Sequence, residues 1–568
     1  MYHCVTKATP RTGGMVLRNS RRRCLASAAH PEESDVVIVG GGPAGLALAS
    51  ALGNSAEVSN SLRVVLVEAG DLSEIRDWAP AQNSFSNRVS SITNASRAFL
   101  KDIGAWSHVQ LDRTAPVEEM QVWDGISDAR VAFSAAEMMT PERVALDEMS
   151  RLVENLNLQR ALLRHISSMP GVSILDKTKV QSIEKEEREG NGWPLAHLSD
   201  GRVLRARLLV GADGFNSPVR SYAGIESYGW AYDTQAIVAT MNHHPRTAFE
   251  PPNTVAYQRF LPTGPIAFLP LSHTSSSLVW STKPPLAKAL QASDPAVLAG
   301  MINAAFRLPE VSMRYLHNRI LEAHAGGSTL LPDELNKEIA WREQSHNVDP
   351  RTAYSVTALS RSAPGGIPPA GSDLLPPFVT SIQEGTIASF PLRMSHADAY
   401  IGEGRGARTV LVGDAAHTIH PLAGQGLNLG LGDAEALAHC IRTAVRNGGD
   451  VALAPYARDR YFENHKMLSA VDKLHKLYSA TAEPVVWARS VGLEVLNELD
   501  TIKAALMMSA GSARRTDPAS VGWSVAASSL ETVARSVHSA KSVGDTIVGL
   551  AGATAQSLLK RLSNSSRP

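Results

Sequence analysis

Short, nearly unbroken apolar runs recur along the chain, and each is followed at once by a glycine or an acidic residue. They cover residues 35–39, 62–67, 207–210 and 409–412. Continuous apolar runs of this length are typical of strands that are buried on both faces of a parallel sheet. A helical pattern at residues 46–52 separates the first two runs. The pattern therefore predicts a β-α-β unit within a parallel sheet that helices cover.

A different pattern starts near residue 235. Short β-rich runs are broken by proline and glycine, and they lie at residues 237–241, 256–261, 266–270 and 277–281. Such runs are typical of a largely antiparallel sheet, and the helical pattern of residues 282–345 comes directly after them. We therefore expect a second layer or domain that is inserted into the first.

The remaining pattern completes the expected organisation. We expect strands at 172–175 and 387–392, helices at 91–103, 149–164, 434–445 and 454–478, a strand-joining turn at Asp200-Gly201, and a loop at 363–377.

The predicted domains are a discontinuous nucleotide-binding domain at 34–225 and 385–480, an inserted substrate domain with a mostly antiparallel sheet at 226–384, and a C-terminal helical region with a variable tail at 481–568. In that tail, an amphipathic helix on a membrane or partner, a helix packed on the enzyme, and a disordered tail all stay open.

Composition narrows the class of protein. The 568 residues are 44 % hydrophobic and carry a formal net charge of +0, with no basic stripe in the body of the chain. A general nucleic-acid binder is therefore not expected. No run of about 18 apolar residues predicts a membrane-spanning helix. The only cysteines are Cys4, Cys24 and Cys440, which favours a reducing compartment because the body of the chain cannot form an internal disulfide.

The N-terminal segment, residues 1–30, differs from the rest of the chain. It contains Lys7 and five arginines among abundant Ser, Thr and Ala, and the first acidic residue is Glu32. An arginine-rich, acid-free segment is typical of a mitochondrial presequence, whereas a secretory signal needs an apolar run that is absent here. We expect residues 1–30 to be such a presequence, with a basic tail that carries no address as the alternative.

The first chemical motif is the glycine-rich turn between the first strand and the first helix. Gly40, Gly42 and Gly45 fit the G-x-G-x-x-G pattern, and Glu68 ends the second strand. In this context Gly40 permits the tight turn, Gly42 lets the backbone approach a pyrophosphate, and Gly45 lets the helix pack closely on the strand. The helix N-terminus attracts phosphate, and Glu68 is placed to accept hydrogen bonds from a ribose. We predict a dinucleotide site.

Two further motifs follow later strands. Residues 211–214 read Gly-Ala-Asp-Gly, with the carboxylate at Asp213, and Gly413 is followed by Asp414. A strand that ends in Gly-Asp presents the carboxylate at the ligand-binding edge of the sheet, where Asp414 is suited to the sugar-alcohol chain of a flavin. Residues 424–428, Gly-Gln-Gly-Leu-Asn, bring bare backbone N–H groups to the start of a helix, which stabilises negative charge on a flavin ring.

These motifs, in this order, resemble those of the class A flavoprotein aromatic hydroxylases, which act on p-hydroxybenzoate or phenol. The resemblance covers roughly residues 34–480. Further runs, at residues 87–92, 120–124, 258–265, 279–282 and 333–336, are similar to those of the ubiquinone-biosynthesis hydroxylases of mitochondria. The resemblance implies an α/β fold, with a Rossmann-like FAD-binding domain of the p-hydroxybenzoate hydroxylase type, an inserted mostly antiparallel β-sheet substrate domain, and C-terminal helices.

The resemblance also assigns roles by motif position. The cofactor FAD is expected to contact Gly40, Gly42, Gly45, Glu68, Arg88, Asp213, Asp414, Gly426, Leu427 and Asn428. Arg88 is placed near the flavin phosphates or ribityl chain, and Asp213 braces the site. The loop expected beside the flavin ring and the reaction chamber contains Pro421, Gly424, Gln425 and Gly426, with no assigned base. No metal is expected.

The family's reaction is FAD-dependent hydroxylation, through a flavin hydroperoxide, at ring carbon 5 of a polyprenylated 4-hydroxybenzoate-derived intermediate of ubiquinone. The implied partners are this polyprenyl phenolic substrate, O2, ferredoxin with ferredoxin reductase as electron donor, and other coenzyme Q biosynthesis enzymes. The implied location is the matrix face of the inner mitochondrial membrane, as a peripheral protein, and no nucleic acid is expected as a partner.

Several alternatives stay open at this point. The chain is alternatively a FAD monooxygenase for another phenolic or isoprenoid substrate, a FAD protein that only passes electrons, or a FAD-holding assembly subunit. His417 is either a general base or a residue that packs or hydrogen-bonds inside its loop. Trp280, Phe260 and Phe268 either line a tunnel for a prenyl tail or belong to the core.

Overall fold

The computed structural model describes residues 30–498, apart from 82, 128, 138–145, 188–191, 245–251, 347–374 and 422–423, and describes side chains as far as Leu493. The expected presequence, most of the expected loop at 363–377 and the C-terminal tail lie outside the described residues. Within the described part of the chain, no helix is both long and apolar enough to span a bilayer.

The first layer is a parallel-centred sheet that carries the predicted β-α-β unit. In the described residues it has seven strands, ordered β8-β2-β1-β11-β10-β9, and β18 pairs with β11. The strands are β1 (Glu32–Val39), β2 (Val64–Val67), β8 (Val172–Leu175), β9 (Val180–Lys185), β10 (Pro194–Leu198), β11 (Val203–Gly211) and β18 (Thr409–Leu411). The strands β8, β2, β1, β11 and β18 are mutually parallel, which confirms the interpretation of the apolar runs.

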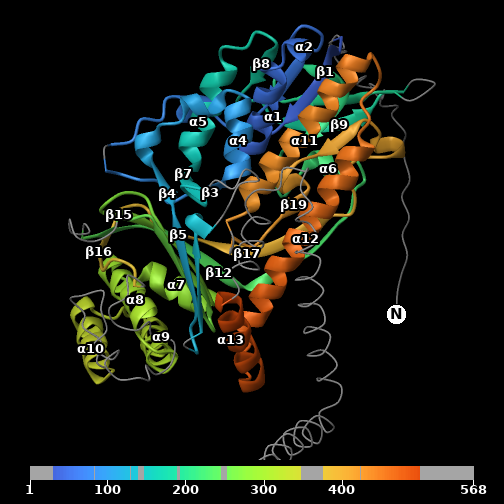
Figure 1. Cartoon of the computed structure of the whole chain (residues 1–568). Helices are drawn as coiled ribbons and strands as arrows, with labels where there is room; N and C mark the ends of the chain where they lie inside the picture. Colours follow the sequence, from blue (N-terminus) through green and yellow to red (C-terminus); the bar gives the residue numbers. More distant parts are fainter. Residues whose placement is uncertain are drawn as a thin grey trace, which may run out of the picture.

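Helices cover this sheet because their own surfaces are apolar. Every residue of α1 (Pro43–Gly53) from Gly45 to Leu52 is buried, as expected for a helix that is apolar on all sides. It contacts α5 (Asn155–Ile166) and α11 (Gly426–Asn447), and the three helices lie together in Figure 1. Their packing fixes the N-terminus of α1 above the carboxyl ends of β1 and β2.

The second sheet is antiparallel, as predicted, except for one parallel pair between β5 and β13. Its order is β19-β17-β12-β15-β14-β13-β5-β6, with β16 beside β12. The strands are β5 (Glu119–Asp124), β6 (Arg130–Ser134), β12 (Ser227–His243), β13 (Val255–Leu261), β14 (Gly264–Pro270), β15 (Ser275–Thr282), β16 (Val379–Ile382), β17 (Ala388–Ala397) and β19 (His417–Thr418). Because β5, β6, β17 and β19 come from outside residues 226–384, the sheet crosses the predicted domain boundaries.

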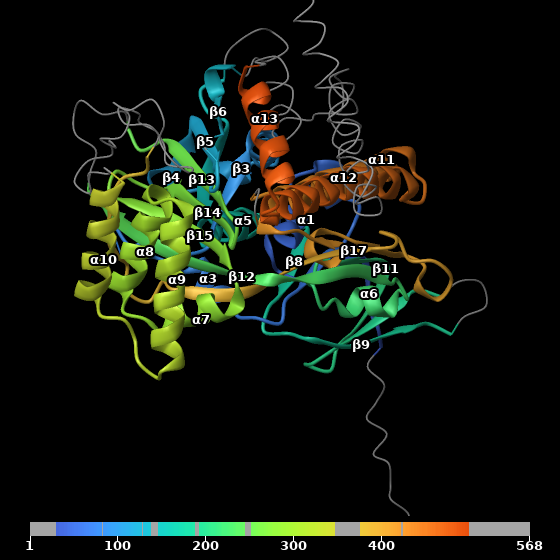
Figure 2. The ribbon, with the colours of Figure 1, turned by 90° about the horizontal axis from the view of Figure 1, so that it is seen from below.

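Four helices follow β15 in the chain and bury one face of this sheet, as Figure 2 shows. They are α7 (Pro284–Ala292), α8 (Pro295–Arg307), α9 (Glu310–Ala325) and α10 (Pro332–Ser345). Their apolar residues form one core with Trp280 and Phe268 of the sheet. The other face of the sheet is turned toward the first layer.

A small sheet, ordered β3-β7-β4 and formed by β3 (Val89–Thr93), β4 (Thr114–Val117) and β7 (Ser150–Glu154), corrects two predicted helices. The helices expected at 91–103 and 149–164 begin later, as α4 (Asn94–Asp102) and α5. The first residues of both windows instead pair with each other as antiparallel strands. The side chain of Thr93 accepts a hydrogen bond from Ser96 N, which makes Thr93 the N-cap that ends the strand and starts α4.

The chain then passes from α11 into α12 (Ala454–Ser479) and α13 (Glu483–Glu498). In Figure 1, α13 lies at the lower end of α12, beside the second sheet. A fully buried ion pair fixes it there, because Arg489 donates to both carboxylate oxygens of Asp124 on β5. Arg489 also donates to the carbonyl oxygen of Ala480, 2.6 Å away, just past the end of α12.

Candidate functional site

A large cavity of about 2790 Å³ lies between the layers. Typical small-molecule pockets hold roughly 300–1,000 Å³, so this cavity has room for a dinucleotide and a second ligand. All three sequence motifs reach it. The lining includes Gly42, Pro43 and Ala44 of the first motif, Ala212 and Gly214 of the second, and Asp414, Pro421, Gly424, Gln425, Gly426 and Leu427 of the third. The fold thus brings together motifs from opposite ends of the described chain.

The glycine motif shows why its spacing matters. Gly40 has φ +114°, and a Cβ there would lie 2.2 Å from the carbonyl oxygen of Ala212. A Cβ at Gly45 would lie 2.1 Å from the carbonyl oxygen of Gly40, so no larger residue fits at either position. Gly42 is in the opposite situation, with nothing within 4 Å of a Cβ built there. Gly42 is the N-cap of α1 and lines the cavity, so the positive end of the helix faces the cavity. The first turn of α1 has no acidic residue that would neutralise this charge.

Glu68 follows β2, as predicted, and its carboxylate is already held by the backbone. One oxygen accepts a hydrogen bond from Gly41 N, and the other accepts one from Gly70 N at 2.6 Å. Glu68 is not among the cavity-lining residues that the structure describes. It supports the glycine turn directly, and its contact with a ribose stays a prediction.

Asp213 of the second motif is not among the described cavity-lining residues, whereas its neighbours Ala212 and Gly214 are. One carboxylate oxygen accepts a hydrogen bond from Val219 N at 3.1 Å, and the other is buried without a partner among the described residues. Burial raises the pKa of this carboxyl group, and the bond from Ser217 opposes the rise. Arg220, on the short helix α6 (Pro218–Tyr222) that follows the second motif, donates to the carbonyl oxygen of Ala415 at 2.8 Å, directly after Asp414 of the third motif.

Asp414 is the carboxylate of the third motif that lines the cavity. It follows Gly413, whose φ of +59° makes a turn that a residue with a side chain rarely adopts. Burial raises the pKa of Asp414, and the nearby His417 partly opposes this rise. The position suits a carboxylate that accepts hydrogen bonds from hydroxyl groups of a ligand.

Directly behind this turn lies Asp433, which the sequence alone did not single out. It is fully buried and accepts four hydrogen bonds, from Gly413 N, His417 Nε2, Arg460 Nε and Asn464 Nδ2, at 2.6–3.0 Å. Burial alone would raise the pKa of Asp433, but the charges of His417 and Arg460 outweigh burial and hold it well below its usual range. One signal was available, since Asp433 is an isolated acid on an otherwise apolar face of α11.

This network assigns His417 to the second of its two interpretations, the hydrogen bond inside the loop. His417 is 1 % exposed, and its Nε2 lies 2.6 Å from Asp433. His420 is also buried, and desolvation with the neighbouring His475 lowers its pKa to about 3. Neither histidine is among the described lining residues. In the part of the chain that the structure describes, no group of three or more His, Cys, Asp or Glu side chains is placed to hold a metal ion.

The predicted flavin-ring loop leads into α11. Gly424, with φ +60°, donates its N–H to the carbonyl oxygen of Pro421, and α11 begins at Gly426. The side chain of Asn428 has a structural role, because it accepts from Thr93 N and donates to the carbonyl oxygen of Ser91. Residues 424–427 line the cavity, whereas Asn428 ties the loop to β3.

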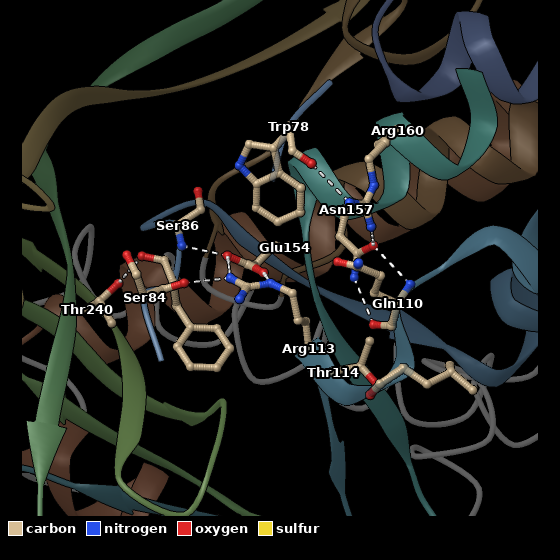
Figure 3. A network of polar contacts seen from close by, with 12 residues as sticks. Trp78, Ser84, Ser86, Gln110, Arg113, Thr114, Glu154, Asn157, Arg160 and Thr240 are labelled. Carbon is tan, nitrogen blue, oxygen red and sulfur yellow. Dashed lines mark hydrogen bonds and ion pairs between the residues drawn. The ribbon is translucent and has the colours of Figure 1, made fainter. Parts of the chain in front are cut away.

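Arg88 also lines the cavity, together with Ser86 and Asn87. Its side chain is exposed, and no ion pair joins it to a carboxylate among the described residues. The neighbouring residues are held by a buried polar network around Arg113 and Glu154, which Figure 3 shows. An exposed guanidinium at this position is suited to an anionic ligand group.

Apolar residues of the second sheet and of the C-terminal helices line another part of the same cavity, called here the apolar limb. Its lining includes Met120, Val122, Val131, Phe133 and Phe260 from the sheet, Leu474, Leu477 and Tyr478 from α12, and Val485, Ala488 and Leu493 from α13. Phe260 stacks on Tyr478, with ring centroids 3.9 Å apart. Of the three aromatic residues expected either in a tunnel or in the core, Phe260 lines the cavity and also packs in a small buried cluster with Tyr478 and Leu493. Trp280 and Phe268 belong to the core, because they point to the helix-covered face of the sheet.

The chain matches the family described as FAD binding domain over residues 33–326 and 381–488. Similar proteins include ubiquinone biosynthesis monooxygenase COQ6, mitochondrial, of Xenopus tropicalis, which is 38 % identical over 87 % of this chain and 96 % of that protein. The protein of the same name from Schizosaccharomyces pombe is 36 % identical over 83 % of this chain and 90 % of its own length, and the one from Homo sapiens is 34 % identical over 88 % and 96 %.

Solved structures extend the comparison to the fold alone. The p-nitrophenol 4-monooxygenase PnpA from Pseudomonas putida DLL-E4 aligns with a TM-score of 0.55 at 17 % identity, covering 85 % of this chain and 100 % of PnpA. P. aeruginosa PqsL in complex with 2-aminobenzoylacetate aligns with a TM-score of 0.54 at 22 % identity, covering 82 % and 100 %. These matches confirm the expected α/β fold with an inserted sheet.

Proposed function

We propose the reaction of this chain from its family, since it belongs to the FAD-binding-domain family and, within it, to the mitochondrial ubiquinone biosynthesis monooxygenases. In our proposal it hydroxylates ring carbon 5 of a polyprenylated 4-hydroxybenzoate-derived phenol. It is an FAD-dependent aromatic monooxygenase. The proposal adds the ring position, the prenylated substrate and the residues that act. The observation that carries it is one cavity that is lined both by the glycine-rich motifs and by the apolar residues of the second sheet and the C-terminal helices.

The residues at the polar end fit FAD. The open space at Gly42, before an uncompensated helix N-terminus, is suited to the pyrophosphate, and the exposed guanidinium of Arg88 is suited to its negative charge. In our proposal Glu68 holds the adenosine ribose and Asp414 holds the ribityl chain. Asp213 braces the flavin site from the turn at residues 211–214. Bound FAD supplies the electrons and the O2 activation that ring hydroxylation requires.

The flavin-ring loop has two roles in this proposal. Pro421 and residues 424–427 form one wall of the reaction chamber, and the free N–H groups at the start of α11 stabilise negative charge on the ring beside them. The predominantly apolar lining excludes water while the phenol ring is oriented. No general base is assigned, because His417 and His420 are committed to buried contacts.

The apolar limb is suited to the prenyl tail. Each buried CH₂ group contributes roughly 0.8 kcal/mol, so a tail of several isoprene units gains enough from the limb to balance its stability in a bilayer. Phe260 and Tyr478 stack as part of the wall, and Leu477, the residue before Tyr478, also lines it. A ring held at the chamber with its tail in this limb has one orientation, which would select the position that is hydroxylated.

We also propose an electron donor and a location for the protein. Electrons come from ferredoxin and ferredoxin reductase, and the protein works at the matrix face of the inner membrane with other coenzyme Q enzymes. Support for the compartment comes from the relatives, which are named mitochondrial, and from the arginine-rich N-terminal segment. The domain division at residues 226–384 also stays a proposal, with β5, β6, β17 and β19 as shared strands.

Single-turnover oxidation with ¹⁸O2 tests the proposal. Purified protein that holds FAD is reduced chemically and mixed with a short-tailed prenyl 4-hydroxybenzoate-derived phenol. We expect one ¹⁸O atom in the product, at ring carbon 5, and much less product from the Asp414→Ala variant. Reoxidation without labelled product would contradict the proposal, and label at another carbon would contradict the ring position alone. Repeating the assay with NADPH, or with ferredoxin and its reductase, tests the electron donor.

A further inference from the structure

Residues 84–88, called here the strap, form a short irregular segment that lines the cavity through Ser86, Asn87 and Arg88. The strap enters β3 directly, at Val89. It lies between the small sheet and the second sheet, and it makes polar contacts on both sides, with Arg113 and Glu154 on one side and with Thr240 of β12 on the other (Figure 3). What holds the strap therefore determines where the guanidinium of Arg88 lies in the cavity.

On the side of the small sheet, a buried ion pair holds the strap. Glu154 is fully buried at the end of β7 and accepts hydrogen bonds from Arg113 Nε at 2.8 Å and Arg113 Nη2 at 2.9 Å. Glu154 also accepts from Ser86 N at 2.6 Å, and Arg113 donates to the carbonyl oxygen of Ser84 at 2.6 Å. The Arg113 guanidinium further lies 4.8 Å from the ring centroid of Phe85. Charge-assisted bonds of this bidentate kind are strong and geometrically specific.

On the other side, one amide of the second sheet grips the same residues. Gln383, at the turn that follows β16, accepts from Phe85 N at 3.0 Å and donates to the carbonyl oxygen of Phe85 at 3.0 Å. Thr240 of β12 donates to the same carbonyl oxygen at 3.2 Å. Asn87 donates to the carbonyl oxygen of Thr386, just beyond Gln383 in the chain. The strap is thus bonded to segments that lie far from it in sequence.

We propose that Arg113, Glu154 and Gln383 are positioning residues that set Arg88 against the cofactor, so that the substrate-binding sheet contributes to FAD affinity through the strap. None of the three is among the described lining residues, so each acts through Arg88 rather than on a ligand. The inference rests on the proposed contact between Arg88 and FAD. Its physical basis is that bonds from two sheets hold residues 84–87 from both sides. The backbone of Arg88 is itself anchored, since its carbonyl oxygen accepts from Asn155 N at 3.0 Å, so release of either side changes the direction of the guanidinium rather than detaching the residue.

The chain offers a matched control for Gln383. Asn303 of α8 clamps Val379 of β16 in the same two-bond manner, accepting from its N–H at 2.8 Å and donating to its carbonyl oxygen at 2.9 Å. It holds the same region of the second sheet, but both of its amide bonds go to β16 rather than to the strap. Gln383→Ala and Asn303→Ala therefore each remove an amide that bonds both backbone groups of one residue. Only Gln383 holds the strap, to which it also donates a third bond at Ser84 Oγ, 3.2 Å away.

The experiment measures FAD dissociation from the holoenzyme, by the recovery of flavin fluorescence on dilution, together with the urea midpoint of unfolding. We expect Arg88→Ala to raise the FAD Kd about tenfold or more, as loss of a charge-assisted bond does. Gln383→Ala is expected to raise it about fivefold, and the double variant to stay within about twofold of Arg88→Ala. Asn303→Ala is expected to lower the urea midpoint while the Kd stays within about twofold of the parent protein.

The outcomes separate the inference from the proposed function. If Arg88→Ala leaves the Kd unchanged, the contact between Arg88 and FAD is wrong and the inference falls with it. If Arg88→Ala weakens FAD binding but Gln383→Ala behaves like Asn303→Ala, only the inference is overturned. Thr240→Val, which is nearly isosteric, covers the case in which Gln383→Ala does not fold. It is expected to raise the Kd by a smaller factor, and an unchanged Kd for this variant would equally overturn the inference.

Discussion

Replacing Asp433 by asparagine tests the buried support behind the third motif. The carboxylate accepts from Gly413 N and His417 Nε2 through one oxygen and from Arg460 Nε and Asn464 Nδ2 through the other. An asparagine side chain has only one acceptor oxygen. If that oxygen stays with the Arg460 side, the new NH₂ group faces Gly413 N, and the turn that carries Asp414 loses its anchor.

The size of the effect follows from burial. Asp433 is fully buried, and Arg460 is its ion-pair partner at 2.7 Å. Removing one partner of such a pair costs about 3–5 kcal/mol of unfolding free energy, because the remaining charge is left buried without compensation. The loosened Gly413 turn is expected to weaken FAD binding as well, by about tenfold. We expect both losses in Asp433→Asn.

Urea unfolding and FAD titration measure the two quantities. The control is the double variant Asp433→Asn with Arg460→Met, which removes the stranded charge and should recover part of the stability but not the FAD affinity. A single variant whose unfolding free energy lies within about 0.5 kcal/mol of the parent protein, with FAD affinity unchanged, would refute the reasoning. A double variant less stable than the single one would show that the stranded charge is not the cause.

Three further predictions concern the site and its surroundings. Asp414→Ala is expected to weaken FAD binding about 10- to 100-fold, the range for losing a charged hydrogen-bond acceptor, and an unchanged FAD titration would remove Asp414 from the cofactor site. Leu477→Trp, in the apolar limb, is expected to raise the KM for a long-tailed phenol at least fivefold, while the KM for an analogue without a tail stays within twofold. Equal effects on the two KM values would place the tail elsewhere. Burial lowers the pKa of His317 to about 4. The contribution of neutral His317 to the free energy of unfolding is fully present above its unfolded pKa of about 6.5 and is lost as the pH falls toward 4. Between pH 7 and pH 5, the parent protein should therefore lose roughly 2 kcal/mol more unfolding free energy than the His317→Gln variant. Parallel urea midpoints for the two proteins across this range would contradict that assignment.

The elements that can be predicted well from the sequence are those whose signal is local. Between residues 35 and 68, strand, glycine turn, helix and acidic end follow one another, and each has one physical explanation. Gly40 and Gly45 could be assigned because only glycine fits where two backbone segments touch, and the structure places a carbonyl oxygen at both positions. The antiparallel sheet is predictable for the same reason, from runs that turn residues separate.

The parts that local patterns do not predict depend on contacts between distant segments. The strands β3 and β7 overlap the starts of two predicted helices, because their pairing joins segments that are far apart in sequence, with Val89 opposite Glu154. Asp433 is recognisable as a support only when Gly413 and Arg460 converge on it. The choice between Phe260 and Trp280 for the cavity wall required knowledge of which face of the sheet the helices cover, and alternation along a strand does not contain that information.

The most direct test of the central claim is a crystal structure of the protein purified with its flavin. The claim is that three distant motifs hold one FAD molecule at the polar end of a cavity whose other limb is apolar. We predict one FAD per chain, with its pyrophosphate at Gly42, its ribityl chain at Asp414 and its ring beside residues 424–427. Flavin bound away from these residues, or protein that crystallises without flavin from solutions saturated in FAD, would contradict the account.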